Sequence, residues 1–195
     1  SAAFTLIAAG GRLAIALRQA RSATESYRLA QTDDLTGLPN RRAVVEEIDA
    51  RAARGPVSLL ILDFDVFKDV NDTWGHAVGD VVLATLAARV TESIRQGDSV
   101  GRIGGDEMLV ALPCLHSVDE AVEIAEKIRR RAAEPIEHAG NTIRVTVSIG
   151  ATIAVPDDTV SSITARADAA MYHAKSADRN TVIPIEPTRR SPAVS

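Results

Sequence analysis

The chain has 195 residues, of which 46% are hydrophobic and 25% are charged, a composition typical of an ordinary globular protein with one main domain. Its formal net charge of −4 and isoelectric point near 5.6 exclude a general binder of nucleic-acid polymers, because no basic excess is available to neutralise a phosphate backbone. Cys114 is the only cysteine, which excludes a disulfide framework and agrees with a reducing cytoplasm.

Residues 1–31 predict a helix ahead of the globular domain. Phe4 to Ala9 is apolar, but Arg12 ends the run well short of the roughly 20 residues that span a bilayer. The arginines that follow suit either the cytoplasmic exit of a truncated membrane-spanning helix or a soluble amphipathic helix. Apolar residues between Leu13 and Tyr27 also form a short heptad seam, as in a coiled coil.

From Thr32 onward, helical and strand patterns alternate. The expected order is a helix capped by Asn40, a buried strand over residues 57–62, a helix over 77–94, a hairpin around Gly104, a helix capped by Ser117 with Glu120 completing a capping box, a β-rich segment over 142–155, a helix over 163–177 and a short strand over 181–185. This order predicts an α/β domain with a mixed central sheet flanked by helices. We therefore expect residues 32–186 to form the domain and 187–195 a disordered tail.

The hairpin signal combines a turn with two carboxylates. Gly104 and Gly105 predict a tight two-residue turn in which both glycines take positive φ. Asp106 and Glu107 follow at once, and acidic residues are poor strand formers, so we expect a metal or a polar reaction there. Asp63 ends the upstream strand, and two strand ends that offer carboxylates to one point predict a hard-cation site.

The segment after the buried strand is polar and offers several ligands. Asp63 and Asp65 are two residues apart, so both need not be ligands, and the alternative is that they end a strand and cap a helix. Backbone N–H groups in the next turn, with Lys68 beside them, suit phosphate oxygens. Asn71 and Asp80 can pair with a guanine edge, although Asp80 could instead only complement a helix dipole.

A cationic pair stands near the end of the last predicted helix. Lys175 and Arg179 are four residues apart, so they project to one side of a helix end. Such a pair can hold a polyphosphate, and the alternative is a solvated C-terminal cap.

Taken together, these motifs resemble the GGDEF-domain diguanylate cyclases. The matching segments are residues 34–42, 63–80, 104–107, 148–151 and 170–175, in the order and spacing of that family, across roughly residues 32–185. The resemblance implies a fold like those of nucleotidyl cyclases and polymerase palm domains. It also implies condensation of two GTP molecules into cyclic di-GMP with release of two pyrophosphates.

The same resemblance implies roles for individual residues. Asp63 and Asp106 would ligate Mg²⁺ or Mn²⁺ with the backbone carbonyl of Phe64, and Glu107 would be a further ligand or the base for the 3′-hydroxyl. The implied substrate-binding residues are Asn71 and Asp80 for guanine, Phe67, Lys68, Lys175 and Arg179 for the triphosphate, and Gly104 and Gly105 beside them. Because one domain holds one GTP, two domains must meet, and a twofold homodimer paired by the N-terminal helix is the expected arrangement.

Arg95 and Asp98 match the family's inhibitory R-x-x-D site in sequence and position. The resemblance implies that the cyclic di-GMP product binds there and inhibits, while the alternative is a helix-terminal Arg followed by a turn-forming Asp. Two departures from the family pattern stand out. Met108 replaces a phenylalanine, whose inward space a flexible apolar Met can fill, and Ala177-Asp178 replaces a common glycine before Arg179.

Three hypotheses follow for the activity. The first is an active diguanylate cyclase, which the intact acidic and cationic residues favour. The second is a weak or inactive domain that senses cyclic di-GMP or GTP, and the third is a dimerising output stub. The expected location is the cytoplasm, at the cytoplasmic face of a membrane if the N-terminal segment continues into a spanning helix.

Overall fold

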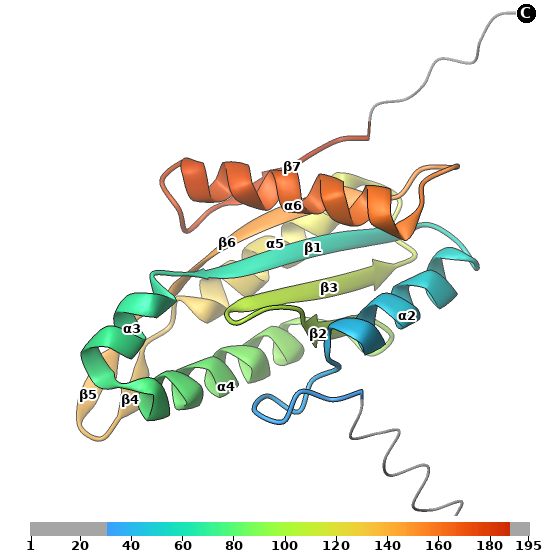
Figure 1. The fold of residues 1–195 in the computed structure, drawn as a ribbon. Coiled ribbons are helices and arrows are strands. Elements are labelled where there is room, and N and C mark those ends of the chain that lie inside the picture. The colour runs from blue at the N-terminus through green and yellow to red at the C-terminus, as the bar shows by residue number, and fades with distance from the viewer. Residues whose placement is uncertain (1–30, 188–195) are drawn as a thin grey trace, which may run out of the picture.

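The structure is a computed structural model that describes residues 31–187, and its ribbon is a sheet with helices on both faces (Figure 1). The elements are α2 (Arg41–Ala52), β1 (Val57–Asp65), α3 (Phe67–Trp74), α4 (His76–Ser93), β2 (Ser99–Arg102), β3 (Glu107–Pro113), α5 (Val118–Ala132), β4 (Ile136–His138), β5 (Asn141–Ile143), β6 (Thr146–Ile153), α6 (Val160–Ser176) and β7 (Val182–Pro184). The helix expected over residues 1–31 and the tail expected over 187–195 lie, apart from one end residue each, outside the described residues. The proposed domain bounds stay predictions.

The main sheet has five strands in the order β2-β3-β1-β6-β7. β1 is central and antiparallel to both β3 and β6, whereas β7 runs parallel to β6. The mixed sheet predicted from the sequence is thus confirmed. β4 and β5 form a separate two-stranded hairpin, of which the sequence predicts only the second strand.

β1 is buried along its whole length, as its continuous apolar run predicts. Leu60 and Leu62 belong to the core beneath α4 and α5, while Leu59 and Ile61 belong to the core beneath α2 and α6. Successive side chains of a strand point to opposite faces, so one apolar strand supplies both cores. Gly150 in β6 lets α6 pack closely, because an added Cβ would overlap the backbone of α6.

The two predicted helix caps are also confirmed, whereas α6 begins at Val160, three residues before the predicted start. The Asn40 side chain accepts a hydrogen bond from the Ala43 N–H at 3.1 Å, and Ser117 accepts one from the Glu120 N–H at 3.3 Å. The carboxylate of Glu120 accepts from the His116 N–H at 3.4 Å, so the second half of that capping box lies one residue earlier than expected.

Two further parts of the chain differ from the expectation. α3 forms where the sequence predicts a turn, because its eight residues are shorter than the stretch over which helical periodicity can be recognised. α6 ends at Ser176, so Arg179 lies beyond the helix rather than on it. Among the helices of the described residues, none has the length and apolar character needed to cross a bilayer.

Candidate active site

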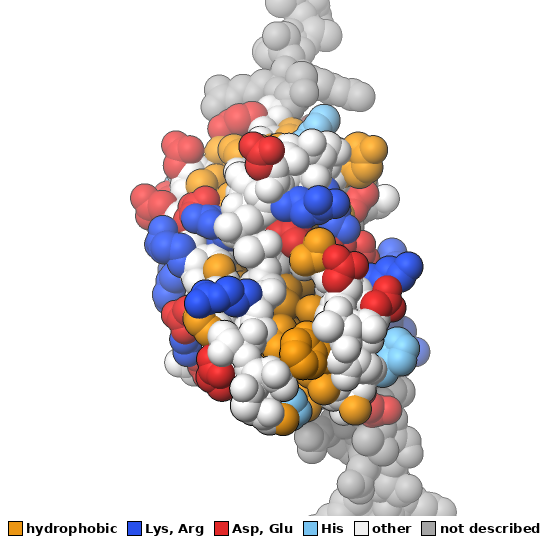
Figure 2. All heavy atoms as spheres, turned by 90° about the vertical axis from the view of Figure 1, so that its left-hand side faces the viewer, with side chains coloured by type: hydrophobic (Ala, Val, Ile, Leu, Met, Phe, Trp, Pro, Cys, Tyr) orange, Lys and Arg blue, Asp and Glu red, His pale blue; other side chains and the backbone are white. Residues whose placement is uncertain are grey.

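Four segments that are distant in sequence meet at one end of the sheet. They are the C-terminal end of β1, helix α3, the loop between β2 and β3, and the C-terminal end of α6, all toward the left-hand side of Figure 1. Figure 2 looks onto this end, where hydrophobic side chains line a hollow and charged side chains of both signs surround it. Most of the predicted site residues belong to these segments.

The loop between β2 and β3 is longer than the predicted two-residue turn. Strand pairing stops at Arg102 and Met108, and neither Gly104 nor Gly105 has positive φ. The Arg102 guanidinium donates to the carbonyl of Gly104 at 3.1 Å and to that of Gly105 at 2.7 Å. Because this side chain satisfies the loop carbonyls, the chain needs no tight turn with left-handed glycines, and that prediction was wrong.

Gly104 is nevertheless required by a close approach. A Cβ at this position would lie 2.5 Å from Oε2 of Glu107 and 3.2 Å from its Cβ, which is closer than side chains normally pack. A Cβ on Gly105 would meet no atom within 4 Å. The first glycine therefore makes room for the Glu107 carboxylate, and the second leaves open space in front of the loop.

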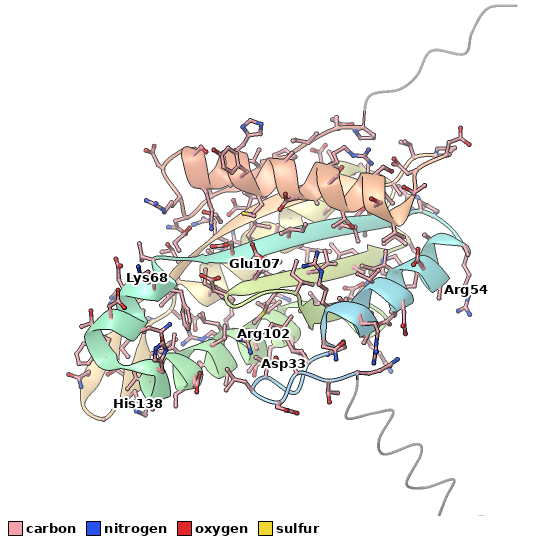
Figure 3. All side chains as sticks on the ribbon, in the orientation of Figure 1. Asp33, Arg54, Lys68, Arg102, Glu107 and His138 are labelled. Carbon is pink, nitrogen blue, oxygen red and sulfur yellow. The ribbon has the colours of Figure 1, made fainter. Side chains whose placement is uncertain are left out.

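Arg102 also ties the loop to the first described segment of the chain. Its Nη1 donates to both carboxylate oxygens of Asp33 at 3.0 Å, and Figure 3 shows the two side chains together. Asp33 also accepts from the Thr36 N–H at 2.9 Å and its hydroxyl at 2.7 Å. Although burial opposes ionisation, hydrogen bonds from Thr36 and Arg102 lower the pKa of Asp33. No local pattern in the sequence predicts this contact between Asp33 and Arg102, since only the fold brings them together.

Three carboxylates gather where β1 meets β3. Asp63 lies opposite Glu107 in the strand register and is only 3% exposed. Burial raises the pKa of Asp63 to about 6, the negative charges of Asp106 and Glu107 add to the rise, and Lys175 opposes it. Nζ of Lys175 lies 2.5 Å from Oδ2 of Asp63, so an ammonium group compensates the cluster in this arrangement.

The donor set fits a hard divalent cation. Asp63, Asp106 and Glu107 offer oxygen ligands of the kind that Mg²⁺ and Mn²⁺ prefer, and the Phe64 N–H donates to the Asp106 carbonyl at 3.2 Å, which holds the two backbones together. Within residues 31–187, however, no three acidic, His or Cys side chains lie close enough together to hold a metal ion in this arrangement. The Lys175 ammonium beside Asp63 takes the place of part of the positive charge that a cation would bring.

Asp65 faces a different environment from Asp63. It is 2% exposed and accepts hydrogen bonds of 2.7 Å from the hydroxyls of both Thr146 and Ser148. It also accepts from the Asn180 N–H at 3.0 Å. These contacts make Asp65 a structural anchor rather than a ligand, in agreement with the expectation that both aspartates need not bind a metal.

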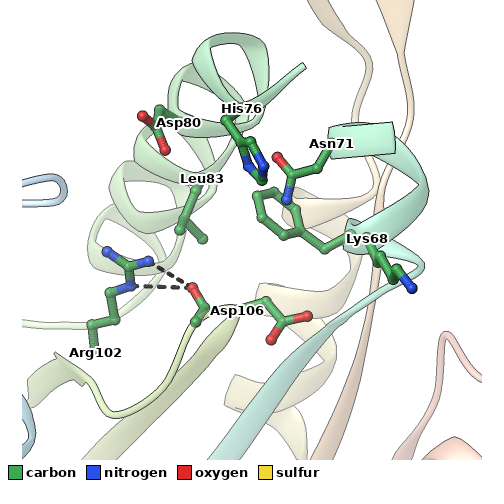
Figure 4. Close-up of a pocket in the computed structure, with 9 residues that line it drawn as sticks. Lys68, Asn71, His76, Asp80, Leu83, Arg102 and Asp106 are labelled. Carbon is green, nitrogen blue, oxygen red and sulfur yellow. Dashed lines mark hydrogen bonds between the residues drawn. The ribbon is translucent and has the colours of Figure 1, made fainter. Parts of the chain in front are cut away.

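A cavity of about 340 Å³ adjoins the carboxylates. Its lining residues are Phe67, Lys68, Asn71, His76, Asp80, Leu83, Arg102, Gly105 and Asp106. In Figure 4, Asn71 and His76 lie close together on one wall, and Arg102 and Asp106 lie on another. The cavity thus joins residues expected at guanine and at phosphate. Its walls also include His76, Leu83 and Arg102, for which the sequence predicts no role in the site.

Gly79 explains how Asn71 reaches the cavity. A Cβ on Gly79 would overlap Oδ1 of Asn71, so the amide lies directly against the backbone of α4. Gly75, with φ of 81°, separates α3 from α4 and allows the chain to turn between them. Asn71 is on α3 and Asp80 is on α4, so two consecutive helices bring these two side chains to the same cavity.

The remaining predicted residues lie apart from this cavity. Lys175 contacts Asp63, whereas Arg179 is exposed in the turn after α6. Arg95 and Asp98 pair with each other, with Nε of Arg95 3.3 Å from Oδ1 of Asp98, and the Asp98 side chain is only 1% exposed. Met108 is buried in the main core, so it fills the inward space as expected.

The amino-acid sequence is similar to those of known proteins. A family model described as "Diguanylate cyclase, GGDEF domain" matches residues 30–181. The response regulator PleD of Caulobacter vibrioides is 40% identical over 167 residues, which are 81% of this chain and 37% of PleD. The diguanylate cyclase DgcP of Pseudomonas aeruginosa is 38% identical over 157 residues, 77% of this chain and 23% of DgcP. The chain thus spans well under half the length of these relatives.

The solved structures give the same result for the fold. The coiled coil and GGDEF domain of DgcB from Caulobacter crescentus, in complex with c-di-GMP, matches with a TM-score of 0.83 and 29% identity. The match covers 90% of this chain and 96% of that one. The mixed sheet with its flanking helices is therefore shared with a protein whose complex contains the cyclic dinucleotide.

Proposed function

The chain belongs to the family of diguanylate cyclase GGDEF domains, and on that basis we propose that it condenses two GTP molecules into cyclic di-GMP, with release of two pyrophosphates. The observation that carries the proposal is the cavity in which Asn71 and Asp80 stand beside Asp106, next to the carboxylates of Asp63 and Glu107. Groups that suit a guanine edge and groups that suit a reacting phosphate thus share one site.

Recognition of the base rests on hydrogen bonding. The Asp80 carboxylate would accept from the N1–H and the N2 amino group of guanine, and the Asn71 amide can both donate and accept. Phe67 and Leu83 add apolar wall to the same cavity, where the base would lie. Adenine lacks both donors, so the site would favour GTP.

The triphosphate would lie toward α3 and the end of α6. Phe67 and Lys68 begin α3, whose N-cap Val66 has no capping side-chain hydrogen bond, so backbone N–H groups at this helix start suit phosphate oxygens. Lys68 lines the cavity, and Lys175 and Arg179 would add positive charge from the other side. For Lys175 this requires its ammonium to exchange its contact with Asp63 for a phosphate.

Asp63, the Phe64 carbonyl, Asp106 and Glu107 would hold Mg²⁺ or Mn²⁺. When bound, the cation would neutralise charge that develops on the α-phosphate and favour ionisation of the attacking 3′-hydroxyl. Glu107 would accept the proton of that hydroxyl, and its place against Gly104 keeps its carboxylate at the mouth of the loop. Arg102 would hold the loop in shape during the reaction.

Two copies of the chain must face each other to join two nucleotides, so we propose a twofold homodimer as the active form. Feedback by the product at Arg95 and Asp98 is a further part of the proposal. In this structure the Arg95 guanidinium donates to the Asp98 carboxylate at 3.3 Å and to the Pro113 carbonyl at 3.0 Å. Binding of cyclic di-GMP would therefore exchange these internal contacts for contacts to guanine and phosphate.

The test is to incubate the purified chain with GTP and Mg²⁺ and to separate the products by chromatography. Formation of cyclic di-GMP that is lost in Glu107→Gln but kept in the surface control Glu137→Gln would support the proposal. Binding of cyclic di-GMP without any synthesis would favour the sensor hypothesis instead. Neither synthesis nor nucleotide binding would leave only the dimerising stub.

A further inference from the structure

The turn after α6 has an unusual backbone. Arg179 has φ of 55° and Asn180 has φ of 45°, so two consecutive residues other than glycine are left-handed. Asn tolerates this region through its short polar side chain, but Arg does not favour it. A conformation of this kind persists only when the surrounding structure holds it in place.

Two separate elements hold this turn through Asn180. From β1, the Asp65 carboxylate accepts the Asn180 N–H at 3.0 Å. From α5, Nη1 of Arg129 donates to Oδ1 of Asn180 at 2.9 Å and to its carbonyl at 3.4 Å. The backbone and the side chain of one residue are therefore bound by two different elements.

Both anchors are themselves fixed. Asp65 is buried and accepts 2.7 Å hydrogen bonds from the hydroxyls of Thr146 and Ser148 in β6. Arg129 is oriented by Glu126, whose Oε2 lies 3.0 Å from its Nε. Asn180 is thus bound to a strand of the sheet and to α5, and both side chains that bind it are held by hydrogen bonds of their own.

Lys175 and Arg179 depend on different supports. Lys175 lies on α6, so the helix itself fixes the direction of its side chain. Arg179 lies beyond the end of that helix, and its position follows from the left-handed turn alone. Whatever holds Asn180 therefore fixes the backbone at Arg179, from which the guanidinium extends.

We propose that Asp65 and Arg129 are positioning residues that lock Asn180 and thereby aim Arg179 at the phosphates of the bound nucleotide. This inference rests on the proposed function, which assigns the triphosphate to Lys175 and Arg179. Arg129 is on α5, and α5 contributes no residue to the nucleotide cavity, so the residue acts on the ligand only through the turn.

The test compares two nucleotides on the whole chain by calorimetry in Mg²⁺. Arg129→Ala should bind a non-hydrolysable GTP analogue roughly tenfold more weakly, because an aimed charge-assisted contact to phosphate is lost. Its affinity for GMP should not change, since guanine recognition does not involve the turn. Arg130→Ala, one residue along the same helix and paired only loosely with Glu126 at 4.0 Å, should match the parent for both ligands.

A second variant tests the linkage through Asn180. Glycine takes left-handed φ without strain and has no side-chain amide, so only the 3.4 Å contact of Arg129 with the backbone carbonyl remains in an Asn180→Gly background. Arg129→Ala should therefore cause a clearly smaller further loss there than in the parent. Should alanine at 129 lower the melting temperature strongly, Arg129→Gln provides the same comparison with a polar side chain kept. Equal losses for the GTP analogue and GMP would overturn the inference, as would no loss for either.

Arg179→Ala separates this inference from the function on which it rests. If Arg179→Ala leaves binding of the GTP analogue unchanged, the proposed phosphate role of Arg179 fails. If Arg179→Ala weakens the analogue but Arg129→Ala does not, the phosphate role stands and the positioning role of Arg129 is wrong.

Discussion

Replacing Gly104 by alanine should impair the reaction far more than it affects the fold. The new Cβ would lie 2.5 Å from Oε2 and 3.2 Å from both Cβ and Cδ of Glu107, so the Glu107 side chain must leave its present rotamer. A side-chain torsion held about 30° away from a staggered rotamer costs about 0.5–1.5 kcal/mol. Gly104 does not have positive φ, so alanine fits its backbone. Alanine also has less conformational freedom than glycine in the unfolded chain, which stabilises the folded protein by about 0.4–1 kcal/mol and offsets part of that cost.

The net change in unfolding free energy should therefore stay within about 1 kcal/mol, which corresponds to a shift in melting temperature of roughly 2–4 °C for a domain of this size. The rate should fall by roughly 100-fold, because displacing a catalytic group by about 1 Å has an effect of that order. Glu107 is the residue displaced, and it is the proposed base.

The assay is the initial rate of cyclic di-GMP formation at saturating GTP, with thermal melts of the same samples. Gly55→Ala is the matched control, because its Cβ would meet no atom within 4 Å and its loop is far from the site. A Gly104→Ala protein that keeps a rate within twofold of the parent would refute the reasoning. So would a Gly104→Ala protein that loses activity only because it unfolds.

Three further outcomes are expected. GTP should react roughly 10- to 100-fold faster than ATP, because adenine would leave the Asp80 carboxylate without donors; comparable rates would contradict base reading by Asp80. The ion pair with Arg166 lowers the pKa of Asp158 to about 2. Asp158→Asn should therefore lower the melting temperature at pH 7, and this decrease should shrink as the pH falls from about 4 toward 2. A decrease that does not depend on pH would be inconsistent with that ion pair. Arg95→Ala should weaken cyclic di-GMP binding in calorimetry and raise the final product yield. An unchanged affinity would mean that Arg95 and Asp98 only stabilise the turn and do not bind the product.

Much of this protein follows from the sequence by itself. The apolar run of β1 predicts a strand buried on both faces, and Asn40 and Ser117 predict helix starts, because each signal depends only on residues a few positions apart. The family follows in the same way, since its motifs are short and occur in a set order. The mixed sheet followed from alternating helices and strands together with one hairpin.

The tertiary structure alone decided how the site is held together. The loop at Gly104 takes its shape from Arg102, which binds Asp33, and the turn at Arg179 takes its shape from Asn180 and its distant anchors. The charge of Asp63 is compensated by Lys175, which belongs to the last helix. Hydrogen bonds and ion pairs act over a few ångströms in space whatever the separation along the chain, so no local pattern can reveal which distant side chain will satisfy a given loop carbonyl or buried carboxylate.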